Sequence, residues 1–241
     1  MYESIIERQI GILRTILSDI AVTDKNGSEV FIVFIKKYFG FENDFGWNIL
    51  MNAFYVYEDT ELAKKDYREF GLQGACRHRN IGEKYLRLYG ILNALYQQFF
   101  ALRNLMELFK LEPREEYIRT FLESECIKLR NKIAAHPTNY SSERNSKQFD
   151  VYEISRPELE RENSCLLVKN QEDLESYDLE SAIDEFDKAT QQVLSKILEK
   201  FINKKYKNKG NYYLEFQKIE KIRNGIIEIG GNIIEFEEQK K

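Results

Sequence analysis

The stretch 81-IGEKYLRLYGILNALYQQFFALRNLMELFK-110 decides the fold class of this chain. Apolar and aromatic residues recur in it every three to four positions, which is the spacing of one face of an α-helix. The members of this stripe are Tyr85, Leu88, Tyr89, Leu92, Leu95, Tyr96, Phe99, Leu102, Met106 and Phe109. Because the stripe is sustained over many turns, we predict a long helix in the core of the protein.

Further helices are predicted on both sides of this stretch. Residues 4–18 carry an apolar stripe made of Ile5, Ile6, Ile10, Leu13 and Leu17. Pro113 suits the first position of the next helix, which is expected to end near His136 because Pro137 disfavours helical geometry in the residue before it. Helical patterns return over 179–201 and again over 212–229, where Gly230-Gly231 is read as a stop signal.

The remaining segments are less regular. Residues 28–57 are expected to contain short helix and strand pieces, with 30–35 as a buried strand or core segment. The runs 149–154 and 165–168 flank a polar segment and predict a small β-hairpin. The sequence therefore predicts a mainly α fold, a helical bundle with a small β-hairpin insertion. We expect one domain over 1–241, with its core at 80–140, C-terminal helices at 178–230 and the β insertion at 149–169.

The composition limits the class of protein. The chain has 241 residues, of which 43% are hydrophobic and 32% charged, so it can bury a sizeable core and keep a polar surface. Its formal net charge of -4 means that any contact with RNA must come from a local basic patch. No apolar run approaches the length of a membrane span, and the N-terminus lacks the pattern of a secretory signal. We expect a cytoplasmic protein with no membrane partner.

The three cysteines give no sign of a cross-link or a metal site. Cys76, Cys126 and Cys165 are odd in number, far apart and without a Cys-x-x-Cys pair, which favours ordinary thiols. The acidic residues have no metal-ligand spacing with a histidine, and there is no phosphate-binding loop or dinucleotide fingerprint. We therefore expect neither metal nor cofactor.

The chemistry-bearing segment is 129-LRNKIAAHP-137, near the predicted end of the second long helix. An arginine can hold a phosphate in a two-pronged contact, and an imidazole can move protons near neutral pH. Arg130 and His136 are therefore a minimal set for metal-free cleavage of RNA. A purely structural interpretation is that Arg130 is a surface or ion-paired arginine and that His136 complements the helix dipole.

Arg130, Asn131 and His136 resemble the signature of the HEPN superfamily. That signature is an Arg and a His with four to six residues between them, and the first of these is often polar, such as Asn. Five residues lie between Arg130 and His136. The resemblance covers about residues 80–140. It implies a helical bundle that often dimerises and a metal-independent ribonuclease acting as a toxin or in antiviral defence. Some members carry a regulatory Tyr two residues after the His, modified by a nucleotidyltransferase partner; Thr138 stands there, and the nearest tyrosine is Tyr140.

The mechanism implied by the resemblance is attack of an RNA 2′-hydroxyl on the adjacent phosphate. His136 would act as general base or acid, or orient the hydroxyl, while Arg130 would stabilise the transition state and Asn131 would add a hydrogen bond. In an ideal helix the Arg130 and His136 side chains would lie ~120° and ~9 Å apart. A distortion near Pro137 or a second subunit would have to bring them together, so we predict a two-fold homodimer with this helix near its interface.

Other basic residues are candidates for RNA binding. Arg77 and Arg79 flank a histidine just before the long helix, although a solvated loop would have the same composition. Lys132 lies inside the motif, and Lys204 and Lys205 belong to a stretch of lysines interleaved with aromatic residues, which also suits the C-terminal end of a helix. The alternative function is a catalytically inactive HEPN-like module that binds RNA or a protein partner. An antitoxin is a further possible partner.

Overall fold

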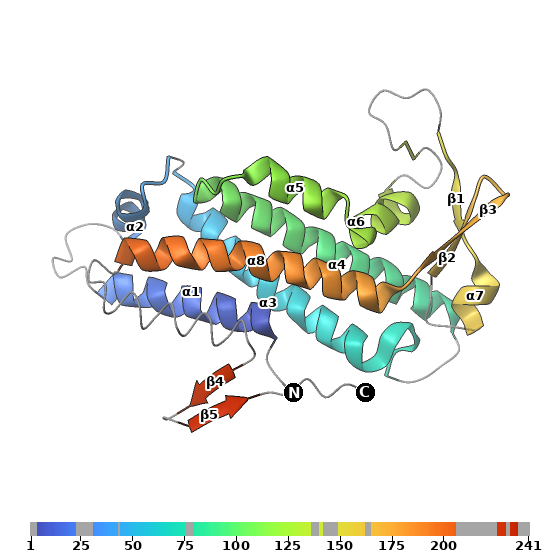
Figure 1. The fold of residues 1–241 in the computed structure, drawn as a ribbon, viewed down its shortest axis with the longest axis horizontal. Coiled ribbons are helices and arrows are strands. Elements are labelled where there is room, and N and C mark those ends of the chain that lie inside the picture. Colours follow the sequence, from blue (N-terminus) through green and yellow to red (C-terminus); the bar gives the residue numbers. More distant parts are fainter. Residues whose placement is uncertain are drawn as a thin grey trace. The chain divides into compact units, whose positions relative to one another are not determined.

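A computed structural model gives the architecture of the chain (Figure 1). The structure describes residues 4–22, 31–42, 44–75, 80–135, 140–141, 149–161, 165–205, 226–229 and 232–235. Their contacts divide the chain into two compact units, each assembled from separate stretches of sequence. The first unit comprises residues 1–57, 101–114 and 190–241, and the second comprises residues 58–100 and 115–189. The predicted class, mainly α with a small β insertion, is confirmed.

The first unit is helical around an apolar core. It contains α1 (Ile5–Val22), α2 (Phe31–Phe39), the start of α3 (Gly46–Phe70), the end of α4 (Ile81–Leu108) and the end of α8 (Leu179–Lys205). The predicted stripe of α1 is buried, with Ile6, Ile10 and Leu13 at most 2% exposed. An aromatic cluster joins three helices and their ends, and its members are Phe39, Phe41, Phe109 and Phe201. Packing of these rings removes apolar surface from water and so stabilises the unit.

The second unit combines helices with a sheet. It contains the rest of α3, η1 (Gly71–Gln73), most of α4, α5 (Arg114–Leu122), α6 (Glu125–Arg130), a π-helix η2 (Asn131–Ala135) and the start of α8. The strands β1 (Tyr152–Ile154), β2 (Cys165–Lys169) and β3 (Asp173–Tyr177) form an antiparallel sheet in the order β1-β2-β3, with helix α7 (Arg156–Arg161) between the first two. Phe121 packs against Phe99 of α4 and Phe186 of α8, so one ring ties three helices together.

Several sequence predictions are corrected by the structure. The single helix predicted from Pro113 to His136 is broken, because Ser124 leaves helical geometry with φ −65° and ψ 146° and begins α6. The segment 30–35 is not a strand: from Phe31 it belongs to α2, with Ile35 fully buried. Helix was predicted across 212–229, yet β4 (Ile226–Ile229) pairs with β5 (Asn232–Glu235) as an antiparallel hairpin. The remainder of that predicted helix, 212–225, lies outside the described residues.

The β insertion is larger than predicted. The expected pairing of the two runs is confirmed, with Tyr152 opposite Lys169 and Ile154 opposite Leu167. The third strand, β3, was not predicted; it pairs with β2 over its whole length and places Tyr177 opposite Cys165. β3 is an edge strand with mostly exposed side chains, which explains why it lacks a hydrophobic pattern. This strand nevertheless contributes the carboxylate that binds Lys132, described below.

Candidate functional site

Arg130 lies at the end of α6, held there by the buried face of that helix. Cys126, Ile127 and Leu129 are each at most 1% exposed and anchor the helix in the second unit. Burial, together with the charge of Asp187, raises the pKa of the Cys126 thiol to about 12, so this cysteine is an inert core residue. Because its neighbours fix the helix, Arg130 is held in a half-buried position at its end.

The guanidinium of Arg130 stacks on an aromatic ring. Its Cζ lies 3.9 Å from the ring centre of Tyr96 on α4, a close cation–π contact. One of its nitrogens, Nη1, donates a hydrogen bond to Oδ1 of Asn131 at 3.1 Å. Among the described residues, no carboxylate forms an ion pair with Arg130. Within the described part of the chain, the contacts therefore fix the orientation of Arg130 without neutralising its charge, and most of its five N–H donors remain for an anion.

The residues after Arg130 form a π-helix rather than an α-helix. Asn131 to Ala135 follow this wider geometry, in which Ile133 is buried and Asn131 is half-buried. Single π turns within helices are often found at functional sites. The ideal-helix separation of ~120° assumed for Arg130 and His136 does not apply across such a turn. His136 itself lies outside the described residues, so the arrangement of the pair stays a prediction.

Lys132 is engaged by the sheet. Its Nζ forms an ion pair with Glu175 of β3 and donates a hydrogen bond to the Tyr177 hydroxyl at 2.8 Å. The ammonium also lies over the rings of Tyr152, at 4.7 Å, and Tyr140, at 5.8 Å. With a side chain only 12% exposed, Lys132 has the contacts of a structural lysine. RNA binding by Lys132 stays a prediction, and it would require these contacts to be exchanged for a phosphate.

The electrostatics of this cluster follow from its contacts. Burial alone would raise the pKa of Glu175, but hydrogen bonds from Lys132 and Tyr177 outweigh it and leave that pKa below its usual value. Burial and the Glu175 charge raise the pKa of both Tyr152 and Tyr177, so these phenols stay protonated. The ion pair between Lys132 and Glu175 thus connects the first turn of η2 to the sheet.

The other predicted RNA-binding residues lie elsewhere. Lys204 is near the end of α8 in the first unit, with its Nζ 5.9 Å from the ring centre of Tyr38, and it lines a hollow of about 420 Å³. Lys200 shares that hollow and donates to the carbonyls of Phe109 and Lys110, each at 2.7 Å. Lys205 ends α8, and its side chain is not described. Arg77 and Arg79 lie outside the described residues.

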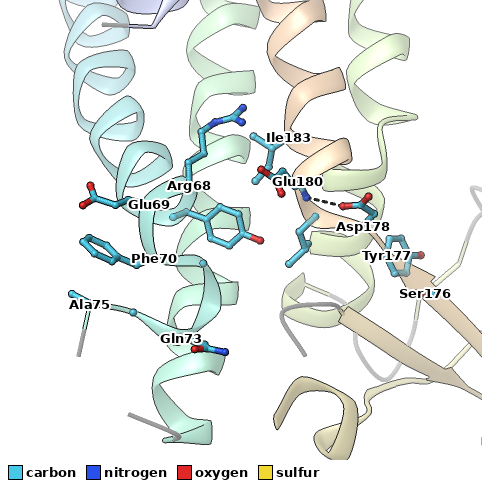
Figure 2. Close-up of a pocket in the computed structure, with 14 residues that line it drawn as sticks. Arg68, Glu69, Phe70, Gln73, Ala75, Ser176, Tyr177, Asp178, Glu180 and Ile183 are labelled. Carbon is cyan, nitrogen blue, oxygen red and sulfur yellow. Dashed lines mark hydrogen bonds between the residues drawn. The ribbon is translucent and has the colours of Figure 1, made fainter. Parts of the chain in front are cut away.

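A second cleft lies away from Arg130. It has a volume of about 900 Å³ and lies between the end of α3 with η1 and the junction of β3 with α8 (Figure 2). Its carboxylates are Glu69, Asp178 and Glu180, while Arg68 is already paired with Asp184 at 2.7 Å. Asp178 caps α8 by accepting a hydrogen bond from the backbone N–H of Glu180, the dashed line in Figure 2. An acidic cleft repels phosphate, so it does not suit RNA.

Comparisons with known proteins found no similar protein. No family model matches the chain, and no curated protein or solved structure shows a significant match to it. Within the described ranges, no group of three or more His, Cys, Asp or Glu residues is placed to hold a metal ion. None of the helices described is both long and apolar enough to cross a membrane. The case for function therefore rests on the side chains themselves.

The structure adds partners that sequence reasoning had not assigned to the site. Tyr96 was predicted only as a core residue of the long stripe, but it is the stacking partner of Arg130. Glu175, Tyr152 and Tyr177 come from the insertion and surround Lys132. Nothing in the linear sequence links residue 132 to residue 175, because the pairing depends on the position of a strand that carries no hydrophobic pattern.

Proposed function

We propose that this protein is a metal-independent endoribonuclease whose site contains Arg130, Asn131 and His136. The observation that carries the proposal is the state of Arg130: its guanidinium is oriented by Tyr96 and Asn131, and no described carboxylate neutralises it. A guanidinium that is held in a fixed orientation stabilises an anionic transition state better than a mobile guanidinium on the surface does. The resemblance of the Arg-Asn…His motif to HEPN ribonucleases supports the same chemistry.

The proposed reaction needs these residues, the RNA and water as a proton donor. A base, His136, takes the proton of the 2′-hydroxyl while its oxygen attacks the adjacent phosphorus. The P–O2′ bond forms, the P–O5′ bond breaks, and the departing 5′ oxygen takes a proton from water. The products are a cyclic phosphate and a 5′-hydroxyl. Arg130 stabilises the extra negative charge on the phosphate oxygens, and Asn131 holds the guanidinium in place.

The cellular role follows from the same resemblance. We propose a toxin or antiviral-defence effector in the cytoplasm, restrained by an antitoxin or a modifying nucleotidyltransferase. The alternative is a catalytically inactive HEPN-like module that binds RNA or a protein partner. One observation favours it: Lys132 is held by Glu175 and Tyr177, which reduces the free positive charge next to Arg130.

The decisive experiment is RNA cleavage in EDTA by the purified wild-type chain beside Arg130→Ala and His136→Ala. Lys128→Ala is the matched control, because Lys128 lies on the same helix and is 42% exposed. We expect cleavage by wild type and Lys128→Ala, with cyclic phosphate ends, and a loss of at least 100-fold in the two site variants. Equal activity in all four proteins would refute the proposed site, and absence of cleavage of any RNA would favour the binding module.

A further inference from the structure

The cleft at the end of α3 is a ligand site that the proposed ribonuclease chemistry does not use. Its walls are the last turn of α3 with η1 on one side and the junction of β3 with α8 on the other (Figure 2). All of its lining residues belong to the second unit, and we call this feature the α3–α8 cleft. Its volume of about 900 Å³ is within the range of small-molecule sites.

The charge of the α3–α8 cleft is negative. Three carboxylates line it, from Glu69, Asp178 and Glu180. Among the described residues of its walls, the only cationic side chain is Arg68. The charge of Arg68 is neutralised within the fold, because it forms ion pairs with Asp184 at 2.7 Å and with Asp187 at 3.2 Å. A molecule that enters the cleft therefore meets carboxylates without a competing free cation in the described walls.

Glu69 is a carboxylate that its own helix disfavours. It stands in the last turn of α3, where the helix dipole carries partial negative charge and a cationic residue would be favourable. Its side chain is exposed, and no described cation forms an ion pair with it. The other two carboxylates have a role in α8, because Asp178 caps that helix and Glu180 lies in its first turn. Glu69 and the C-terminal end of α3 together attract a cation to this wall of the cleft.

A buried hydroxyl without a described partner belongs to the same cleft. Tyr67 lines the cleft although only 8% of its surface is exposed. Burial raises the pKa of this phenol, and the charges of Glu180 and Asp178 raise it further, so the hydroxyl lies within reach of the carboxylates of the α8 wall. No described residue forms a hydrogen bond with it, whereas the Tyr177 hydroxyl donates to Glu175 at 2.8 Å. Because buried polar groups are nearly always paired, the Tyr67 hydroxyl is explained if a ligand in the cleft supplies its partner.

We propose that the α3–α8 cleft binds an alkylammonium cation, a chain of methylene groups with protonated amines, supplied by a free polyamine or by lysine side chains of a peptide. One ammonium group pairs with Glu69 and another with Glu180, which Figure 2 shows on the separate helices α3 and α8. The Tyr67 hydroxyl oxygen accepts a hydrogen bond from an ammonium group. The methylene groups lie along the half-buried ring of Phe70.

An extended organic cation suits the cleft better than a metal ion does. The described residues place no group of three or more His, Cys, Asp or Glu around one point, as a metal ion would require. The carboxylates come instead from two helices, and the walls also contain the apolar side chains of Phe70 and Ile183. A flexible chain can place an ammonium group at each wall, because the three N–H donors of an ammonium need no fixed planar geometry.

Isothermal titration of the full chain with spermidine, at pH 7 and low salt, tests the proposal. We expect a Kd below about 0.5 mM for wild type and a rise of about tenfold for the double variant Glu69→Gln/Glu180→Gln, because two ion pairs are lost. Both side chains are exposed, so this variant should fold normally. The control Glu123→Gln/Glu172→Gln removes the same charge from exposed positions of the same unit and should bind as wild type. Equal weakening in both double variants would overturn the proposal, since binding would then follow net charge alone.

Tyr67→Phe distinguishes a ligand-binding hydroxyl from a structural one. The change removes only the hydroxyl, and no described residue bonds to it, so we expect the melting temperature of the free protein to change by less than about 2 °C. The Kd for spermidine should rise by about threefold or more, because the ligand loses a hydrogen bond. A Tyr67→Phe protein that melts several degrees lower and binds spermidine as wild type does would overturn the role of Tyr67.

Two ligands of equal charge identify the source of the cation. Tighter binding of a capped tetralysine peptide than of spermine would assign the site to lysine side chains of a partner protein, and the reverse or equal affinity would assign it to a free polyamine. If neither ligand binds wild type better than Glu69→Gln/Glu180→Gln, the proposal is wrong. Displacement of spermidine by magnesium chloride beyond the effect of sodium chloride at equal ionic strength would also overturn it. Binding is measured without RNA, so the result is independent of the proposed function.

Discussion

Arg130 and Tyr96 form the most informative contact of the candidate site, with the guanidinium carbon 3.9 Å from the ring centre. The contact requires a flat aromatic face but not the hydroxyl. We therefore expect Tyr96→Phe to retain RNA cleavage within about twofold and Tyr96→Leu to lower kcat/KM by about tenfold or more, because Arg130 loses its orientation. A Tyr96→Leu protein as active as wild type would contradict the role of the stack.

Lys132 should behave as a structural residue. Its ion pair with Glu175 and its hydrogen bond to Tyr177 predict that Lys132→Met lowers the free energy of unfolding by about 1–2 kcal/mol. If Lys132 does not contact phosphate, the slope of log K for RNA binding against log salt will be unchanged. Urea unfolding and binding titrations at several salt concentrations measure the two effects. A slope reduced by about one would instead restore Lys132 as an RNA-binding residue, with the exposed Lys128→Met as the control.

The same pair predicts how stability depends on pH. Burial raises the pKa of Glu175, but the hydrogen bonds from Lys132 and Tyr177 lower it by a larger amount. Its pKa in the folded state is therefore below the ordinary 4.5. A lowered pKa stabilises the fold above the unfolded value, and this contribution is lost as the pH falls below 4.5. Glu175→Gln should therefore be less stable than wild type at pH 7 and should lose less stability on acidification. Parallel pH profiles for the two proteins in urea unfolding would contradict this assignment.

The sequence predicted helix α4 correctly but missed the break at Ser124, and the two results have different physical causes. The 81–110 stripe predicted α4 because burial of one face over many turns leaves a strong period in the sequence. The break at Ser124 had no such signal: the residue begins α6 without a capping hydrogen bond from its side chain, and its hydroxyl instead donates to the Phe121 carbonyl at 2.7 Å. A break that has no capping hydrogen bond and does not change the hydrophobic period is hard to find from local pattern alone.

The hairpin at the C-terminal end could have been predicted. Gly230-Gly231 stands between two isoleucine-rich runs, and a two-glycine connection between β-branched residues is a hairpin signal as well as a helix stop. The Arg130–Tyr96 contact is a different case. The two residues are far apart in the sequence, and Tyr96 has the ordinary spacing of a core position, so only the packing of α6 near α4 reveals its role.

The described cysteines should be unreactive in the folded protein. Burial raises the pKa of Cys126 and of Cys165 to about 12 each. At pH 8 only about one thiol in ten thousand would then be a thiolate, even before access is considered. In a Cys76→Ser background, we expect no rapid reaction with a thiol reagent until denaturant is added, when two equivalents should react. Rapid labelling of the native Cys76→Ser protein would show that one of the two thiols is accessible.

A buried charge network in the second unit should dominate its response to mutation. Lys64 of α3 is 1% exposed and forms ion pairs with Glu61 and with Asp187, the latter at 2.6 Å. Glu61 also accepts a hydrogen bond from the Gln98 side chain at 2.7 Å. Removing Lys64 alone would leave two carboxylates facing each other without their shared cation, because desolvated charges are costly when unpaired.

We therefore expect Lys64→Met to lower the free energy of unfolding by about 3–5 kcal/mol, measured by urea denaturation at pH 7. Adding Glu61→Gln should recover more than half of this loss, because it removes one of the two carboxylate charges that Lys64 bound yet keeps an acceptor for Gln98, while Asp187 retains Arg68 at 3.2 Å. Lys188→Met, at an exposed position of α8, controls for loss of a lysine and should change stability by less than about 0.5 kcal/mol. If the double variant were no more stable than Lys64→Met, the loss would come from packing of the lysine stem, since removing the Glu61 charge would then have had no effect.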